Sequence, residues 1–168
     1  MLKSIMPLNA IIALRFLGLF LVLPVISIYA INLENSSTFL VGIVIGGYAL
    51  TQMLFQIPFG MVSDKIGRKK TIIFGLIIFA IGSILCAISS DIYSLIIGRF
   101  LQGAGAIGAV VTAMISDVVK EEQRPKAMAM MGGSIAASFA ISMIAGPTIG
   151  AFAGIESLFS ALFPYFLV

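Results

Sequence analysis

The chain has 168 residues, of which 60% are hydrophobic and 10% are charged; its mean hydropathy is +1.16 and its formal net charge is +3. Soluble domains carry about 25% charged residues, so this composition excludes a soluble globular protein and predicts an integral membrane protein. The apolar runs are continuous and roughly twenty residues long, which excludes the short alternating strands of a barrel. We therefore expect an all-α fold.

Composition also limits the chemistry. The chain has no histidine and one cysteine, Cys86, which lies within an apolar run. A disulfide framework or a cysteine metal site within one chain is excluded, and no nucleophile stands beside a base. We expect no enzyme activity, no catalytic residue, no metal and no cofactor. The basic residues lie in short loops beside apolar runs, so they predict membrane topology rather than nucleic-acid binding.

The first apolar stretch runs from about Pro7 to Ala30 and contains Arg15, which makes it too long for a signal peptide. We predict a spanning helix there instead. The complete predicted helices cover about 7–32, 38–62, 71–88, 92–116 and 127–153. The third of them carries almost nothing polar except Ser83 and Cys86, which is typical of a helix that faces lipid.

A sixth apolar segment begins at Ser157 and has only 12 residues before Val168. That length reaches roughly 18 Å, against a bilayer core of about 30 Å. We expect the chain to end inside an incomplete sixth helix, 157–168, as a fragment, a truncated reading frame or half of a split protein.

The charges in the links predict the orientation. One side of the predicted bundle carries Lys3, Lys65, Arg68, Lys69, Lys70, Lys120, Arg124 and Lys126. The links on the opposite side carry Glu34, Asp91 and Glu156. The positive-inside rule makes the basic side cytoplasmic, and the N-terminus with it.

Two further cations, Arg15 and Arg99, fall within predicted helices. An arginine at the bilayer centre costs about 2.5 to 3.5 kcal/mol, so it normally faces the bundle interior or an aqueous cavity, although snorkelling toward a headgroup remains an alternative. Both arginines open the tripeptide Arg-Phe-Leu, consistent with an inverted repeat that lines a central site. The predicted cavity or coupling residues are Arg15, Arg99, Gln102, Gln52 and Gln56.

The segment 60–70, GMVSDKIGRKK, packs five charges into a predicted polar loop between two apolar runs. Asp64 and Arg68 are four residues apart, and Gly67 permits a sharp turn. These residues are interpreted as a conformational latch, whereas Lys65, Lys69 and Lys70 can act mainly as topology signals.

The predicted helices 92–116 and 127–153 are rich in glycine. Small groups at four-residue spacing in the former let helix backbones approach closely, so packing alone can explain its glycines. In the latter, Gly146 and Pro147 lie deep in the apolar run, where proline bends a helix. We interpret Gly146, Pro147 and Gly150 as a hinge, and a static kink is the alternative.

Together these motifs resemble the major facilitator superfamily. The segment 60–70 resembles the cytoplasmic motif between helices 2 and 3 of that family, and RFLQGAGAIG at 99–108 resembles its helix 4 motif. Residues 17–25, LGLFLVLPV, are similar to the drug:proton antiporter group. The spacing of the antiporter motif in helix 5 is matched by Gly133, Ser142, Gly146, Pro147, Gly150 and Ala151, with Ser142 and Ala151 where glycines are usual.

The resemblance implies the N-terminal half of a twelve-helix exporter, which works by alternating access with a second six-helix half. It implies proton-coupled efflux of small drug-like or sugar-like compounds across a bacterial inner membrane. Helices 1 and 4 would line the cavity, helices 2 and 5 would flank it, and helix 3 would lie outside. Asp117 becomes a second carboxylate for Arg68. The implied gating residues are Gly60, Asp64, Gly67, Arg68, Lys69 and Asp117.

One departure from the family concerns proton coupling. Many proton-coupled exporters carry a buried carboxylate in helix 1, and no Asp or Glu lies deep in any predicted helix here. Coupling would use the second half, or Asp64 and Asp117. The alternative function is a truncated, non-transporting membrane protein or an interaction partner, which the sequence downstream of Val168 would distinguish.

Overall fold

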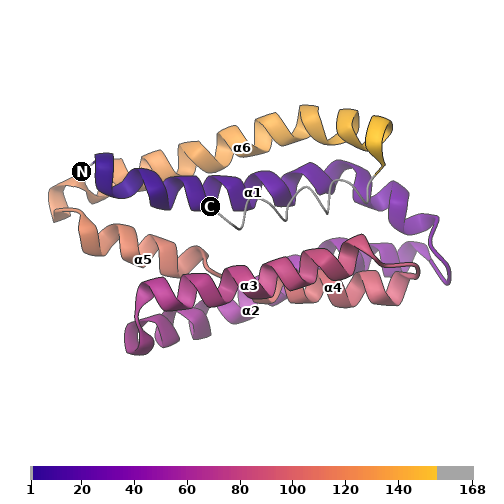
Figure 1. Cartoon of the computed structure of the whole chain (residues 1–168), viewed down its shortest axis with the longest axis horizontal. Helices are drawn as coiled ribbons and strands as arrows, with labels where there is room; N and C mark the ends of the chain where they lie inside the picture. The colour runs from indigo at the N-terminus through magenta and orange to yellow at the C-terminus, as the bar shows by residue number, and fades with distance from the viewer. Residues whose placement is uncertain (1, 155–168) are drawn as a thin grey trace.

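A computed structural model describes residues 2–154, so the predicted sixth helix lies outside the described residues. The elements in chain order are α1 (Leu2–Ile31), α2 (Thr38–Ile66), α3 (Arg68–Ala87), α4 (Ile92–Ala104), α5 (Gly108–Val118), the 3-10 turn η1 (Glu121–Gln123) and α6 (Arg124–Ala153). The long helices lie side by side along the molecule (Figure 1). Five described segments are long and apolar enough to span a bilayer, and the fourth of them, Ile92–Val118, combines α4 and α5. The predicted all-α fold is confirmed.

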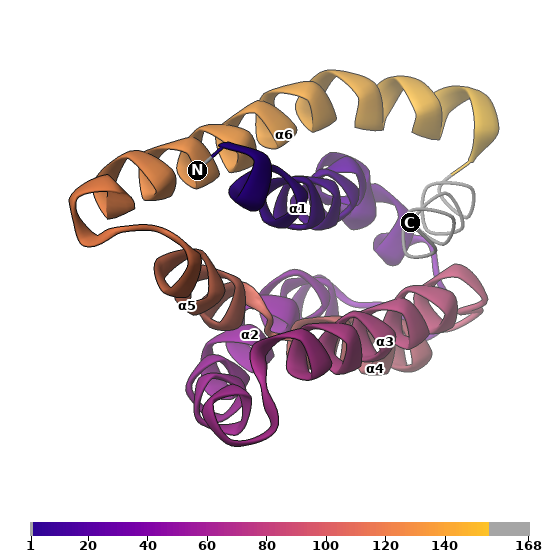
Figure 2. The ribbon, with the colours of Figure 1, turned by 60° about the vertical axis from the view of Figure 1, so that its left-hand side comes forward.

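The helices form two layers. α1 packs along the length of α6, and α4 packs on both α2 and α3, whereas the contacts between the two groups are fewer. Figure 2 shows the pair α1 and α6 apart from α2, α3 and α4, with α5 connecting them at one end. We call these groups the α1–α6 layer and the α2–α3–α4 layer.

Apolar side chains fill the space between the layers at both ends. Near the Glu34 and Asp91 links the buried cluster includes Leu21, Val22, Ile26, Val44, Cys86 and Leu95. Near the opposite end it includes Ile5, Ile12, Phe59, Ile72, Ile107 and Val111. These residues lie within the candidate membrane spans, where close packing of the side chains holds the helices together.

Helix caps close the bundle at the acidic end. The Asp91 carboxylate accepts the backbone N–H of Ser94 at 3.0 Å at the start of α4, and Ser37 caps α2 in a similar way. The Ile92 N–H donates to the Glu34 carbonyl at 3.2 Å, so the two links touch. The bond from the Ser94 backbone holds the pKa of the Asp91 carboxyl below its usual value.

The segment 60–70 is not a polar loop, contrary to the prediction from its charges. α2 continues to Ile66 and α3 begins at Arg68, so only Gly67 separates them. Charged side chains can lie outside the bilayer while the helical backbone keeps its internal hydrogen bonds. The helices therefore continue beyond the ends of their apolar segments. Gly67 has φ 101°, a conformation that favours glycine, and its N–H donates to the Ser63 carbonyl at 3.1 Å.

The predicted continuous helix 92–116 is interrupted at residues 105–107. Gly105 packs so closely on α3 that a Cβ atom there would overlap the carbonyl oxygen of Gly75. The N–H groups of Ala106 and Ile107 turn back to the carbonyls of Ala104 and Gly105, both at 2.9 Å, in place of helical partners. The span is therefore made of two rods, α4 and α5.

A glycine exchange tests the close approach of α2 and α4. A Cβ atom on Gly103 would overlap the Tyr48 carbonyl and the Thr51 hydroxyl, so Gly103→Ala should lower the free energy of unfolding by about 1 to 3 kcal/mol. Gly46 has no atom within 4 Å of such a Cβ, so Gly46→Ala is the matched control. Thermal unfolding of the purified protein in detergent measures both, and equal melting temperatures would contradict the predicted overlap.

Titration tests the Asp91 cap. Because its pKa is lower in the folded state, the cap contributes stability above the unfolded pKa of about 3.9, and this contribution is lost as the pH falls through the folded pKa. Asp91→Asn keeps an acceptor that does not titrate. Melting curves between about pH 2 and 6 should therefore show the two proteins responding differently to acid, and parallel curves would refute the assignment.

Candidate functional site

Arg99 is the largest side chain in the interior of the described chain, with 1% of its surface exposed. Its Nε donates to the Val44 carbonyl of α2 at 3.2 Å, and its Nη1 donates to Oε1 of Gln102 at 2.8 Å. Nε2 of Gln102 in turn donates to the hydroxyl of Ser83 on α3 at 2.8 Å. The guanidinium also lies 5.0 Å from the Tyr48 ring centroid. Arg99 and Gln102 thus link all three helices of the α2–α3–α4 layer.

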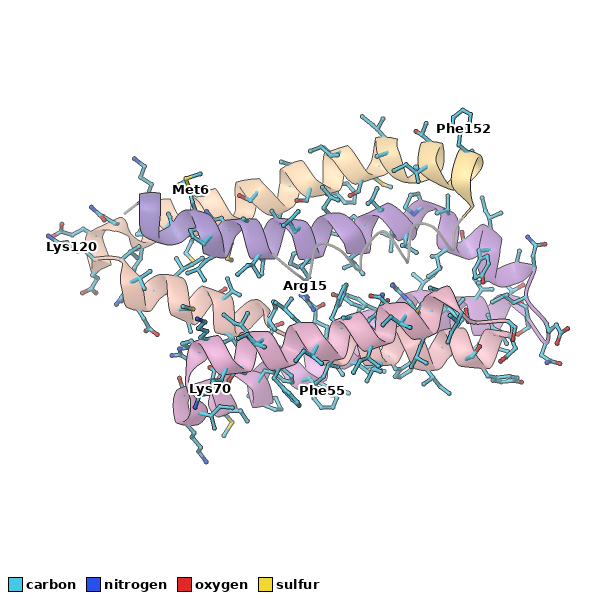
Figure 3. The ribbon with its side chains drawn as sticks, in the orientation of Figure 1. Met6, Arg15, Phe55, Lys70, Lys120 and Phe152 are labelled. Atoms are coloured by element: carbon cyan, nitrogen blue, oxygen red, sulfur yellow. The ribbon has the colours of Figure 1, made fainter. Side chains whose placement is uncertain are left out.

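Arg15 lies where the two layers meet. Its side chain is 3% exposed, and Figure 3 shows it projecting from α1 toward the α2–α3–α4 layer. Nη2 donates to the Gly105 carbonyl at 2.8 Å, which is the site of the interruption between α4 and α5. The guanidinium carbon lies 5.7 Å from the Phe16 ring and 5.2 Å from the Phe79 ring. Both Nε and Nη1 are buried without a hydrogen-bond partner among the described residues.

The two predicted glutamines lie one turn apart on α2 and are both partly buried. The amide of Gln56 faces the start of α5, since its Oε1 would lie 3.5 Å from a Cβ atom on Gly108. Oε1 of Gln52 is buried and has no partner within residues 2–154. Among the hydrogen bonds of the described residues, none joins either glutamine to Arg15 or Arg99.

Arg68 pairs with two carboxylates at the basic end of the bundle. Its Nη1 pairs with Oδ1 of Asp64 at 2.5 Å, and its Nε donates to Oδ2 of Asp117 at 3.0 Å. Nη1 also donates to the hydroxyl of Ser63 at 2.5 Å. The ends of α2 and α5 and the start of α3 are therefore joined through one guanidinium, with Gly67 forming the turn between α2 and α3. We call Asp64, Arg68 and Asp117 the charge cluster.

Gly60 and Lys69, the other predicted gating residues, do not belong to the charge cluster. Gly60 is partly exposed, and no atom lies within 4 Å of a Cβ atom built on it. Lys69 is exposed in the first turn of α3.

α6 is attached to α1 by serine hydroxyls. Ser138 donates to the Ala13 carbonyl at 2.9 Å, and Ser142 donates to the Leu17 carbonyl at 2.8 Å. A Cβ atom on Gly146 would overlap the carbonyl oxygen of Leu21. The Gly146 position is therefore a close contact between α1 and α6. Pro147 lies inside α6 with its side chain exposed, and Gly150 is partly exposed, so their role as a hinge stays a prediction.

Several residues of the site escaped the sequence analysis. Ser83 was assigned only to a lipid-facing helix, yet it is buried and accepts the bond from Gln102. The signal was present, because a serine isolated in an apolar span usually has a hydrogen-bond partner. The carbonyls of Val44 and Gly105 carried no sequence signal, because the packing of the helices decides which backbone carbonyls accept a side-chain hydrogen bond. Ser63, whose hydroxyl accepts from Arg68, was not singled out within the segment 60–70.

A serine exchange tests the buried network around Arg99. Ser83→Ala removes the acceptor of the Gln102 amide, and an unsatisfied buried donor costs about 1 to 3 kcal/mol. The Ser134 hydroxyl donates to the Met130 carbonyl of its own helix, so Ser134→Ala should change stability by much less. Thermal unfolding compares the two variants, and a Ser83→Ala melting temperature as high as that of Ser134→Ala would refute the network.

Comparison with known proteins concerns nearly the whole chain. A family model described as Major Facilitator Superfamily matches residues 8–168. The chain is 50% identical over 152 residues to the inner membrane transport protein YajR of Escherichia coli K12. The aligned residues cover 90% of this chain and 34% of that protein. It is 39% identical over 123 residues to the class B tetracycline resistance protein of Escherichia coli. That alignment covers 73% of this chain and 30% of that protein.

A solved structure has the same fold. The POT family transporter PepTSo aligns with a TM-score of 0.80 and 16% sequence identity, over 99% of this chain and 37% of that one. The chain therefore spans about a third of the length of the relatives that it matches.

Proposed function

Since this chain belongs to the Major Facilitator Superfamily, we propose that it is the N-terminal half of a secondary-active exporter that works by alternating access with a second six-helix half. The family consists of transporters rather than enzymes, and the chain is a multi-pass integral membrane protein whose relatives include an inner membrane transport protein. The proposed cargo is a small drug-like or sugar-like compound, moved against proton entry. The tetracycline resistance relative supports the drug-like class.

The observation that carries the proposal is the charge cluster. Its side chains belong to three helix termini, and its carboxylates are largely exposed, 62% for Asp64 and 56% for Asp117. Exposed ion pairs contribute only about 0 to 1 kcal/mol each, so the cluster can open and close at small cost. An element that switches between states separated by a few kcal/mol needs contacts of this strength.

The proposed orientation puts the charge cluster and the N-terminus in the cytoplasm. Lys65, Lys69, Lys70 and Lys120 are exposed at this end, while Glu34 and Asp91 lie in the links at the other end. Asp64 keeps a solvent-facing edge next to the open Gly60. A helix N-terminus of the second half would stabilise that carboxylate through its macrodipole. Proton coupling would use Asp64 and Asp117, or the second half.

Transport by the complete protein is the direct test. Inverted membrane vesicles that contain the chain with its second half should accumulate tetracycline when their lumen is acidified, and tetracycline should dissipate the proton gradient. Vesicles with residues 1–168 alone should do neither. Failure of a panel of tetracyclines, quinolones and sugars to move the gradient would refute the exporter, whereas efflux by this chain alone would refute the need for a second half.

The charge cluster gives a sharper prediction. Arg68→Ala removes the partner of both Asp64 and Asp117 and leaves two carboxylates to repel each other. A shift of about 1 to 2 kcal/mol between states should slow efflux roughly tenfold. Lys70→Ala removes the same charge from the same exposed end of α3 and should leave the rate unchanged. The measurement is the initial efflux rate of each variant in vesicles, normalised to the amount of inserted protein. Equal rates for the two variants would show that the cluster is only a surface contact.

A further inference from the structure

The outer face of α3 is apolar along most of the helix. Five large side chains on this face are between 41% and 56% exposed: Ile73, Phe74, Ile77, Ile81 and Ile84. They recur at intervals of three or four residues, so they share one side of the helix, and we call them the α3 stripe. Ser83 and Cys86 of the same helix are buried instead. An exposed apolar surface within a membrane span is suited to contact with hydrocarbon.

Three exposed lysines lie at the first end of the α3 stripe. Lys69 and Lys70 belong to the first turn of α3, one turn before Ile73 and Phe74 respectively. Lys65 lies in the last turn of α2, and a single residue separates that helix from α3. Figure 3 shows Lys70 at the start of α3, at one end of the bundle. We call Lys65, Lys69 and Lys70 the lysine group.

The protein does not pair the charges of the lysine group. Within residues 2–154 the ion pairs join Arg68 to Asp64 and to Asp117, and no lysine takes part in one. Asp64 precedes Lys65 in the sequence, but its carboxylate is turned to the guanidinium of Arg68. The ammonium groups of the lysine group are therefore available to an anion from outside the described chain.

We propose that the lysine group binds the phosphate headgroup of an anionic phospholipid whose acyl chains lie along the α3 stripe. Charge complementarity selects the headgroup, because lysine binds phosphate as a point charge and basic residues at the end of a membrane span attract anionic lipids. The α3 stripe selects a lipid over a soluble anion, since only the lipid also covers the apolar side chains. This inference goes beyond the proposed function and does not depend on the transported compound.

The turn of the α3 stripe nearest to the lysine group is supported from α2. The Phe74 ring is stacked on the ring of Phe59, with 6.2 Å between the ring centroids, and Phe59 is buried. Phe74 therefore offers an acyl chain a supported surface. The proposed lipid takes no part in the transport step, so replacement of Lys70 alone is still expected to leave the efflux rate unchanged.

Fluorescence quenching by brominated lipids tests the site. The 168 residues contain no tryptophan, so Phe74→Trp introduces a reporter into the α3 stripe, and the signal of the protein without it is subtracted. The complete transporter is reconstituted with brominated phosphatidylglycerol or brominated phosphatidylcholine, at equal mole fraction and with the same acyl chains. Because each lysine adds roughly fivefold to the attraction of an anionic lipid, phosphatidylglycerol should bind beside the reporter roughly fivefold or more tightly than phosphatidylcholine.

Matched variants separate a defined site from a general attraction of charges. The triple replacement Lys65→Gln, Lys69→Gln and Lys70→Gln should abolish the preference for phosphatidylglycerol. A second triple replacement removes the same charge from the other exposed basic segment, which also holds Glu121 and Glu122, and should keep the preference. Its members are Lys120→Gln, Arg124→Gln and Lys126→Gln. A reporter at Phe152→Trp, at the opposite end of the bundle (Figure 3), should show no preference.

Each other outcome overturns the inference. Equal binding of the two lipids beside Phe74→Trp, or an equal loss of preference in both triple variants, would leave only a general attraction. The absence of quenching by either lipid would show that protein covers the α3 stripe. If inorganic phosphate removes the preference and chloride of equal ionic strength does not, the lysine group binds soluble anions instead. Should Phe74→Trp fail to fold, Ile77→Trp provides the same test.

Discussion

The bilayer interior offers no water to a polar group, and this constraint organises the α2–α3–α4 layer. Arg99 reaches the Val44 carbonyl, and Gln102 reaches Ser83, only because the helix backbones lie very close. Glycine makes that approach possible: a Cβ atom on Gly82 would lie 2.5 Å from the Gln102 nitrogen, and one on Gly98 would lie 2.6 Å from Sγ of Cys86. The glycines thus let the helices pack closely enough to bring hydrogen-bond acceptors within reach of the buried Arg99.

In the α1–α6 layer, serine hydroxyls rather than an arginine make the buried hydrogen bonds between helices. Ser138 and Ser142, one turn apart, each donate to a carbonyl of α1, so the two helices are joined without any charge. Between the layers the polar contacts are sparse, and the bond from Arg15 to Gly105 is one of them. Nε and Nη1 of Arg15, at the junction of the layers, have no hydrogen-bond partner among residues 2–154.

Sequence reasoning predicted the spans, the acidic and basic ends, the buried arginines and the pairing of Asp64 with Arg68, because hydropathy, charge bias and four-residue spacing are local properties. The family resemblance added Asp117, which no local pattern indicates. The interruption at 105–107 could not be predicted, since it depends on the contact between Gly105 and the Gly75 carbonyl of another helix. The helical course of 60–66 was missed because polar composition was taken as the end of the helix, although it marks only the end of the apolar surface.

The interruption after Ala104 has a mechanical consequence. Arg99 belongs to α4 and Asp117 to α5, so the buried network and the carboxylate of the charge cluster stand on separate helices that meet at residues 105–107. A tilt of α5 that pulls Asp117 away from Arg68 need not twist α4 or disturb the hydrogen bonds of Arg99. The half can therefore change its shape at the membrane surface while its interior stays assembled. The bond from Arg15 to the Gly105 carbonyl joins α1 to the segment between these two helices.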